Sequence, residues 1–509
     1  MRKVCDLITA KYTSNDQCSV YCYMDDMTII CDPQVAAEGI DFSIVCAEEC
    51  GFAVNREKSA IICKEFIPIN NNTEDSSDNN NLLNINNNTL SIPTASNEEP
   101  FKLLGVNITN SFEEFNNNII KRADRFFDSL DMIDVHPEIK HLILHFCGRP
   151  RLLYYCETTP PQFAKDVVQH FQHKMKSSFS KIIGVEDLDT IRDEMLHSAF
   201  GANLPDYFSH HEQIYNNTAS YVETRSGYGA VRVELINTSK EDFTSLECSH
   251  DRQWTHYIAP TNVAQLTPIQ YRTALAIRCK LIPDSFRKEI GDDYLKCDCE
   301  TLMIIKNLTK QEEDELNEIV QQTPNAKKAP LVQHLIKCPA MHKLYDSTRH
   351  NLVKNALRHI ANRHGISVYD EPTFYDYQDG LANRPDLTFC IPTQRPYITT
   401  DITIVQPSEK PGVIYVGLAA AEAANKKIQK HAAAVHQRDH QFIPFALETT
   451  GHFDLGAKEL IRVLKSTLPY SQQYDFLRDM YGAVSTALAE YRAEVLINTL
   501  THAKTRRQR

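Results

Sequence analysis

Two pairs of aspartates in this chain could each hold a divalent metal ion. The first pair, Asp25 and Asp26, lies within SVYCYMDDMTIICD, a run of otherwise strand-forming residues, although Asp is among the residues that strands most avoid. Apolar residues alternate on both sides, which predicts a hairpin with the two acids at its tip. Two carboxylates held so closely repel each other unless a cation lies beside them. The pair therefore predicts a metal site, and a simple polar turn is the alternative interpretation.

The second pair, Asp386 and Asp401, lies in RPDLTFCI and YITTDITIVQP, whose β-branched and aromatic residues predict two short strands. Fourteen residues separate the two acids. One carboxylate at the start of each of two adjacent strands can grip a divalent cation against a phosphodiester and lower the pKa of the metal-bound water. We therefore expect these two acids to lie side by side at one metal.

A lysine near such acids would stabilise developing negative charge or position the nucleophile. Position 403, two residues after Asp401, is threonine. The lysines downstream are Lys426, Lys427 and Lys430 in GLAAAEAANKKIQKHAAAVHQRD, an Ala-rich predicted helix. Their spacing allows one helical face to bring Lys430 with a neighbour towards the sheet. We expect Lys430 to assist the acids, and a solvated helix face is the alternative.

Three cysteines and a histidine could form a closed tetrahedral zinc site. YLKCDCE supplies Cys297 and Cys299, and LVQHLIKCPAMH supplies His334 and Cys338. One residue separates the first two ligands, three separate the last two, and 34 separate the halves. The long middle segment has a charged helical pattern and is interpreted as an insertion. Two pairs of buried thiols with a helix-capping histidine are the alternative.

The elements that must position these residues are visible as changes in pattern. Ten of the nineteen residues from Asn70 to Asn88 are Asn, so 68–100 is interpreted as a disordered insertion in a surface loop. Helical periodicity is strong in 112–200 and weaker in 201–290. After about residue 365, strands and helices alternate, which predicts a mixed sheet in an α/β layer, with FIPFALETTG as a further strand.

Composition places the chain among ordinary globular proteins. Its 509 residues suffice for roughly three domains, and it has 42% hydrophobic residues and a net charge of −12. Nucleic acid would therefore have to bind through local basic patches such as the terminal KTRRQR. Scattered cysteines and the lack of an apolar run long enough for a membrane span or a signal peptide predict a nuclear or cytoplasmic protein without membrane contact.

The N-terminal part resembles reverse transcriptases. Tyr23, Met24, Asp25 and Asp26 resemble the Y-x-D-D hairpin of the polymerase palm. GFAVNREKSAII resembles the next palm element of LINE-type enzymes, FKLLGVNI the strand that leads from palm to thumb, and GRPRLLYYCETTPP a thumb segment; the matching residues of the first two are Gly51, Asn55, Lys58, Ser59, Leu104 and Gly105. The Asn-rich tract lies between two of these elements and would be an insertion within the polymerase fold.

The C-terminal part resembles LINE-type (non-LTR) retrotransposon polyproteins that carry a restriction-like endonuclease. The Cys-Cys-His-Cys set is followed closely by Arg349, His350 and Asn351, as in that family. Pro385-Asp386 and Asp401 match its Pro-Asp…Asp pattern, and the lysine of this family commonly comes from the following helix. FIPFALETTG and AKELIRVL resemble the strand and helix that close the nuclease core, where Glu448 is left unassigned between a structural and an accessory acid.

The resemblance implies a multidomain α+β and α/β protein with a partial palm, a thumb-like helical domain, a zinc knuckle and a PD-(D/E)XK-like nuclease with a mixed sheet. We expect the following order: 1–67, C-terminal part of the palm; 68–100, Asn-rich insertion; 101–200, end of the palm and thumb-like domain; 201–290, helical linker; 291–352, zinc knuckle with helical insertion; 353–480, restriction-like endonuclease; 481–509, C-terminal helix and basic tail.

The same resemblance implies the function. Asp386 and Asp401 would bind Mg²⁺ or Mn²⁺ and nick a DNA target, as the first step of target-primed reverse transcription of the element RNA, while Zn²⁺ would occupy the knuckle. Asp25 and Asp26 would be metal ligands of the polymerase. That polymerase needs a further aspartate from an earlier palm strand, so we expect an incomplete polymerase that does not synthesise DNA alone. A catalytically inactive remnant that binds nucleic acid is the alternative.

Overall fold

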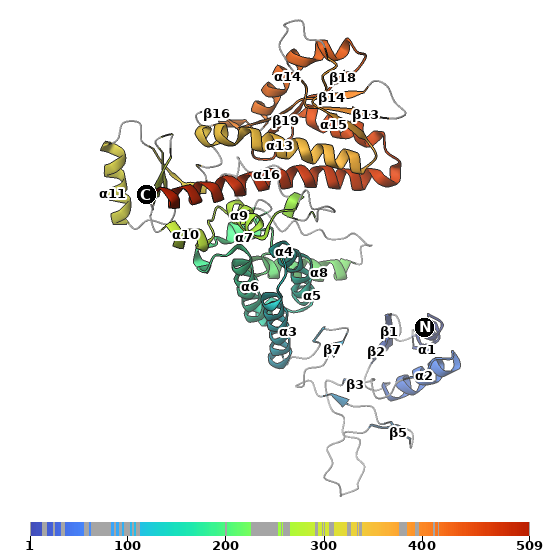
Figure 1. The fold of residues 1–509 in the computed structure, drawn as a ribbon. Helices are drawn as coiled ribbons and strands as arrows, with labels where there is room; N and C mark the ends of the chain where they lie inside the picture. The colour runs from blue at the N-terminus through green and yellow to red at the C-terminus, as the bar shows by residue number, and fades with distance from the viewer. Residues whose placement is uncertain are drawn as a thin grey trace. The chain divides into compact units, whose positions relative to one another are not determined.

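A computed structural model provides the fold, with mixed helix and sheet as the sequence predicts (Figure 1). The structure describes residues 2–12, 18–23, 26–31, 36–54, 61–62, 83–85, 88–90, 94–95, 102–103, 106–107, 112–198, 201–224, 253–255, 257, 265–290, 294–297, 299, 301–304, 310–322, 327–332, 334, 338–375, 384–391, 397–410, 413–415 and 417–507. The chain forms two compact units, Met1–Lys121 and Arg122–Arg509, which are described separately. None of the described helices is both long and apolar enough to cross a membrane.

The first unit contains the predicted hairpin. Strand β1 (Cys18–Tyr23) pairs antiparallel with β2 (Asp26–Cys31), and Tyr23 lies opposite Asp26. The unit also has two helices and three pairs of short strands: α1 (Arg2–Tyr12), α2 (Ala36–Glu49), β3 (Ile61–Ile62) with β6 (Thr94–Ala95), β4 (Leu83–Ile85) with β5 (Asn88–Leu90), and β7 (Lys102–Leu103) with β8 (Val106–Asn107). Most of the Asn-rich insertion at 68–100 lies outside the described residues, and β4, β5 and β6 fall within it.

Helices dominate the first part of the second unit, as the periodicity predicts. The two strongest patterns form α3 (Glu113–Met132), which crosses the boundary between the units, and α6 (Pro161–Ile183). Proline at the first position of α6 and Gly184 in the left-handed region after its end are the usual boundary signals. The other helices are α4 (Pro137–Ile143), a π-helical turn (Leu144–Gly148), α5 (Arg149–Thr158), α7 (Asp193–His197), α8 (Tyr207–Thr224), α9 (Pro268–Arg278) and α10 (Asp284–Ile290).

A three-stranded sheet follows the helices. Strand β10 (Thr301–Ile304) pairs antiparallel with β9 (Tyr294–Lys296) and parallel with β11 (Lys327–Pro330). The charged helix predicted in this segment is α11 (Lys310–Gln322), which connects β10 to β11. The long helix α13 (Pro339–Arg363) then leads to the C-terminal sheet.

The C-terminal sheet is mixed, as predicted. Its strands are β12 (Ser367–Asp370), β13 (Leu387–Cys390), β14 (Ile398–Thr400), β15 (Ile402–Val405), β18 (Gln441–Phe442) and β19 (Phe445–Glu448). Strands β12, β13 and β14 pair antiparallel, whereas β14 with β18 and β15 with β19 pair parallel. Hydrogen bonds from Ile443 N–H to Thr399 O (2.9 Å) and from Phe445 N–H to Asp401 O (3.1 Å) continue the ladder across both interruptions. A small hairpin, β16 (Ser408–Lys410) and β17 (Val413–Tyr415), precedes the crossover helix.

Helices cover both faces of this sheet. Helix α14 (Leu418–His436) lies between β17 and β18 in the chain and packs on one face through small residues such as Ala420 and Ala424 (Figure 1). Helices α13, α15 (Leu455–Ser466) and α16 (Tyr470–Arg507) pack on the other face around a large apolar core. The C-terminal half of α16 also contributes Tyr491 and Leu496 to a second core beside the three-stranded sheet.

Two expected domain boundaries fall inside helices. The boundary at 352/353 lies within α13, and the boundary at 480/481 lies within α16. A helix can continue across such a boundary when its apolar side remains packed against another element. Here α13 and α16 pack against each other. The three-stranded sheet and the C-terminal sheet therefore share two structural helices.

Candidate active site and metal centre

The strand pairing brings Asp386 and Asp401 together. Strands β13 and β14 are paired with Leu387 opposite Thr400, and Asp386 directly precedes this pairing. Asp386 N–H donates to Thr400 O (3.1 Å), and Ile402 N–H donates to Asp386 Oδ2 (2.6 Å). The Asp386 side chain is thus held against the chain beside residue 401, close enough for each acid to affect the pKa of the other.

Both acids are buried, with exposed fractions of 9% for Asp386 and 4% for Asp401. A buried carboxylate is costly unless a cation or hydrogen-bond donors compensate it. Burial and the charge of Asp401 raise the pKa of Asp386. Burial would also raise the pKa of Asp401, but the contacts with His431 and Asp386 and the charge of Lys427 outweigh it and lower that pKa. The pair is therefore unequal, with Asp401 the more strongly ionised acid.

Helix α14 supplies the basic partners of Asp401. Lys427 Nζ lies 2.6 Å from Asp401 Oδ2, and His431 Nε2 lies 3.1 Å from the same oxygen. Residues four apart occupy one stripe of a helix, so both side chains point to the same place. His431 is completely buried, and Lys427 is 27% exposed.

The expectation for Lys430 is corrected by this geometry. Lys430 is exposed, and among the described residues it forms no ion pair with Asp386 or Asp401, whereas Lys427 does. At about 100° per residue, position 430 lies roughly 60° around the helix from position 427. The buried side of α14 contains Ala420, Ala424 and His431. Lys427 lies close to this side of the helix, whereas Lys430 lies further around it towards solvent.

Helix α13 supplies the partner of Asp386 from the other face of the sheet. His350 Nε2 lies 3.0 Å from Asp386 Oδ2, and this hydrogen bond raises the pKa of His350. The preceding Arg349 is buried and donates to Ile404 O (2.8 Å), which fixes α13 against β15. Asn351 is exposed. The structure thus places His350 at the acids and Arg349 in a supporting contact.

Glu448 fixes the start of α14. It is 1% exposed, and its Oε1 accepts from Gly417 N–H (2.8 Å), while the N–H groups of Ala419 and Ala420 also bond to its carboxylate. Burial raises the pKa of Glu448, although these donors act in the opposite direction. Gly417 has φ of +86°, and a Cβ there would lie 2.5 Å from His452 Nε2, so only glycine fits. Glu448 is a structural acid that sets the position of α14, and hence of Lys427.

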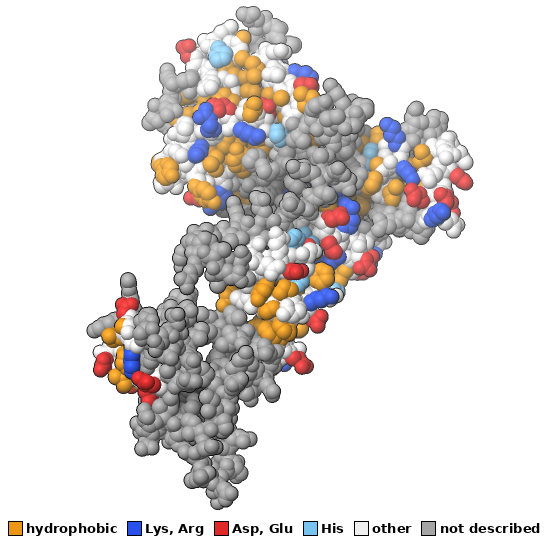
Figure 2. Space-filling model, turned by 180° about the vertical axis from the view of Figure 1, so that it is seen from behind, with side chains coloured by type: hydrophobic (Ala, Val, Ile, Leu, Met, Phe, Trp, Pro, Cys, Tyr) orange, Lys and Arg blue, Asp and Glu red, His pale blue; other side chains and the backbone are white. Residues whose placement is uncertain are grey.

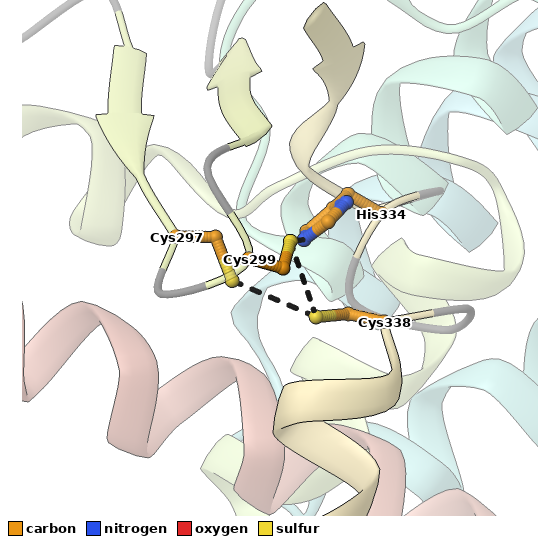
Figure 3. A group of neighbouring side chains, drawn as sticks. All are labelled: Cys297, Cys299, His334 and Cys338. Carbon is orange, nitrogen blue, oxygen red and sulfur yellow. Dashed lines mark hydrogen bonds between the residues drawn. The ribbon is translucent and has the colours of Figure 1, made fainter. Parts of the chain in front are cut away.

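Cys297, Cys299, His334 and Cys338 form a Cys3His cluster that could bind a metal such as zinc (Figure 3). Their ligand atoms all lie within 4.8 Å of one another. Sγ of Cys338 lies 3.6 Å from Sγ of Cys297 and 3.7 Å from Sγ of Cys299, and Cys299 Sγ lies 3.4 Å from His334 Nε2. Zn–S bonds of about 2.3 Å in a tetrahedron place two sulfurs about 3.7 Å apart, so the donor set fits zinc.

The pairing of β10 with β11 explains how so long a gap can separate the two halves of this cluster. Cys297 and Cys299 lie between β9 and β10, His334 follows β11, and Cys338 caps the start of α13. Because β11 runs parallel to β10, its first residue, Lys327, lies opposite Thr301 near the cysteines, and the segment after β11 supplies His334 and Cys338 to the cluster. The insertion therefore leaves the ligand positions together.

The hairpin acids cannot be placed in the same way. Asp26 begins β2, but its side chain and the whole of Asp25 lie outside the described residues, as do Asn55, Lys58, Ser59, Leu104 and Gly105. Within the described part of the chain, the Cys3His cluster is the only set of three or more His, Cys, Asp or Glu residues with all ligand atoms within 4.8 Å. Among the described residues, no third His, Cys, Asp or Glu joins Asp386 and Asp401 within this distance.

Charge is distributed rather than concentrated on the visible surface. In the space-filling view, Lys and Arg side chains of the described residues are scattered among acidic and apolar ones (Figure 2). This agrees with the net charge of −12. Any phosphate contact near the acids would depend on individual cations.

Comparisons with known proteins do not identify a family for this chain. No model of a protein family matches the chain, and no curated protein matches it.

Proposed function

We propose that the C-terminal part of this chain is a divalent-metal-dependent endonuclease that nicks DNA, within a protein of the LINE-type retrotransposon family. The observation that carries the proposal is the placement of two buried acids on neighbouring strands, with Asp386 bonded to Ile402 N–H beside Asp401 and Lys427 paired with Asp401. The order of helix, antiparallel strands, crossover helix and parallel strand around the acids supports a PD-(D/E)XK-like core.

In this proposal Asp386 and Asp401 hold Mg²⁺ or Mn²⁺. Such an ion, when bound, lowers the pKa of its water and offsets charge on the phosphate. The chain itself contributes orientation: Ile402 N–H and His350 fix Asp386, while His431 and Lys427 fix Asp401. Burial excludes bulk water from both carboxylates, which strengthens every charge interaction at the site.

Lys427 is the proposed catalytic cation. Its ammonium group lies at Asp401 yet remains partly exposed, so it can reach both the acid and a phosphate that docks there. A cation aimed at the developing charge stabilises the transition state more than the ground state. Lys427 thus has the role that the sequence assigned to Lys430.

Nicking of supercoiled plasmid by the full chain tests the proposal. Wild-type protein should convert supercoiled to open-circular DNA with Mg²⁺ or Mn²⁺ and not with EDTA. D386N and D401N should each lower the rate at least 100-fold. D439N, an exposed acid just after α14, is the matched control and should nick at the wild-type rate. Equal nicking by wild type, D386N and D401N would refute the proposal.

For the Cys3His cluster we propose structural Zn²⁺. All four positions of a tetrahedron are filled by protein ligands, as in structural rather than catalytic sites. Metal analysis of protein purified without chelators should give one zinc per chain. Protein that is folded and contains no zinc would contradict the assignment.

For the N-terminal unit the proposal is membership of the reverse-transcriptase family, with Asp25 and Asp26 as metal ligands and element RNA as a partner. Its support is the Y-x-D-D sequence and the antiparallel pairing of the strands on either side. Binding of RNA to the full chain, compared with a D25N/D26N variant in the presence and absence of Mg²⁺, tests whether the two acids contribute a metal-dependent contact.

One observation favours a second candidate, a nucleic-acid-binding remnant without catalysis. Both acids already have internal partners, because His350 contacts Asp386 and both Lys427 and His431 contact Asp401. A site whose acids stay neutralised would not need a metal. DNA binding with no metal-dependent nicking in any variant would support this candidate.

A further inference from the structure

His431 is a completely buried histidine at the acid pair. Its Nε2 lies 3.1 Å from Asp401 Oδ2. Its ring also packs against Phe442, with ring centroids 5.5 Å apart and planes inclined by 34°. The imidazole is therefore fixed from two sides, by an apolar ring and by the acid.

The surroundings of His431 on α14 are small and apolar. Ala420, Ala424, Ala434 and Val435 are the other buried residues of this helix. An apolar side chain would satisfy packing alone, and burying a polar ring costs free energy unless it is hydrogen-bonded. The ion pair with Asp401 contributes to offsetting this cost.

His431 and Lys427 reach the same oxygen but differ in freedom. Lys427 is 27% exposed and has a long flexible stem, whereas His431 has no exposed surface. Lys427 can therefore turn towards a phosphate, while His431 stays in place. When Lys427 moves, His431 is the remaining contact from α14 to this carboxylate oxygen.

We propose that His431 is a positioning residue, whose imidazole contacts Oδ2 of Asp401 through Nε2 and holds this carboxylate in its metal-binding orientation. The inference rests on the proposed function, because that function makes Asp401 a metal ligand. It goes further by assigning a role to a histidine that contacts neither the metal nor the DNA. Outer partners of this kind usually contribute 10- to 100-fold to metal affinity.

Binding of Mn²⁺ to the full chain without DNA tests the inference. The cluster of Cys297, Cys299, His334 and Cys338 is first loaded with Zn²⁺, and free Mn²⁺ is then measured by electron paramagnetic resonance during titration. In H431Q the amide nitrogen can occupy the position of Nε2, whereas the shorter side chain in H431N cannot. We expect near-wild-type affinity for H431Q and at least tenfold weaker binding for H431N. H436N changes an exposed histidine of the same helix and should bind as wild type.

Thermal unfolding of each variant in EDTA controls for folding, and H431Q and H431N are compared at temperatures where both are folded. Equal Mn²⁺ affinity of H431N and wild type would overturn the inference, as would equal losses in H431Q and H431N. Mn²⁺ binding that depends on Asp401 and on His431, without any nicking, would refute the proposed function alone. If D401N and wild type bind Mn²⁺ equally, or neither binds it, both the proposed function and the inference are refuted.

Discussion

His350 Nε2 lies 3.0 Å from Asp386 Oδ2, and His350 belongs to the helix that Cys338 caps. One helix thus joins the Cys3His cluster to the acid pair. Because α13 also packs against β12, β13 and β15, its placement affects both sites.

Replacement of His350 should impair nicking more than folding. H350A removes the donor to Asp386 Oδ2, and we expect the nicking rate at limiting Mg²⁺ to fall about 10- to 100-fold. Steady-state nicking across a Mg²⁺ series measures the effect, and saturating Mg²⁺ should restore part of the rate. N362A, at an exposed position near the C-terminal end of the same helix, is the control. A rate unchanged at every Mg²⁺ concentration would show that His350 does not act through the metal-binding acids.

The two lysines of α14 should differ in their effects. K427M removes the ammonium group at Asp401, and we expect the single-turnover nicking rate to fall at least 100-fold at saturating DNA and Mg²⁺. K430M removes an exposed cation and should leave this rate within about threefold of wild type, because side chains outside the site have small effects. A larger loss of nicking rate in K430M than in K427M would instead support Lys430, as the sequence suggested.

Removal of zinc should destabilise the region around α13. C338S eliminates one ligand and the thiol contacts to Cys297 and Cys299. Structural zinc sites contribute several kcal/mol to folding, so we expect the unfolding temperature to fall by more than 5 °C. C147S changes an exposed cysteine and should have no effect. Calorimetry with and without a zinc chelator measures both variants, and a chelator-insensitive wild-type protein would contradict the prediction.

A partly buried acid in the helical region should make stability depend on pH. Burial raises the pKa of Glu138 from 4.5 to about 7. The protonated form is therefore favoured in the folded protein, so this contribution is complete below pH 4.5 and is lost as pH rises through 7. We expect E138Q to stabilise the protein by on the order of 2 kcal/mol at pH 8 and to have little effect at pH 4.5. Urea unfolding at both pH values measures this, with exposed Glu212 as the site of the control E212Q. A stabilisation that is equal at both pH values would exclude titration as its cause.

The C-terminal sheet could be predicted from the sequence because its elements have strong local patterns. β-Branched strands, the Ala-rich helix α14 and the amphipathic α15 all occur where periodicity indicates them. Strand β12 was missed, since SVYD is short and largely exposed. The hairpin of β16 and β17 was missed as well.

The grouping of the candidate site residues could be predicted from the sequence, but their detailed contacts could not. Residue type and spacing identified the two acids and the Cys3His set, which the structure brings together. The choice between Lys427 and Lys430 depends on the rotational phase of α14, which Glu448 and Gly417 set through a non-local contact. His431 could have been found from its position four residues after Lys427 on an otherwise alanine-lined stripe. The parallel pairing of β10 with β11 is also non-local and had no sequence signal.

Helix α16 has a mechanical consequence for the protein. Its N-terminal half supplies Phe476 and Met480 to the core beneath the C-terminal sheet, and its C-terminal half supplies Tyr491 and Leu496 to the core beside the three-stranded sheet. A proteolytic cut in the middle of this helix would leave each core without one wall. The two cores should consequently melt as a single cooperative block, and neither can be excised as an autonomous module at that point.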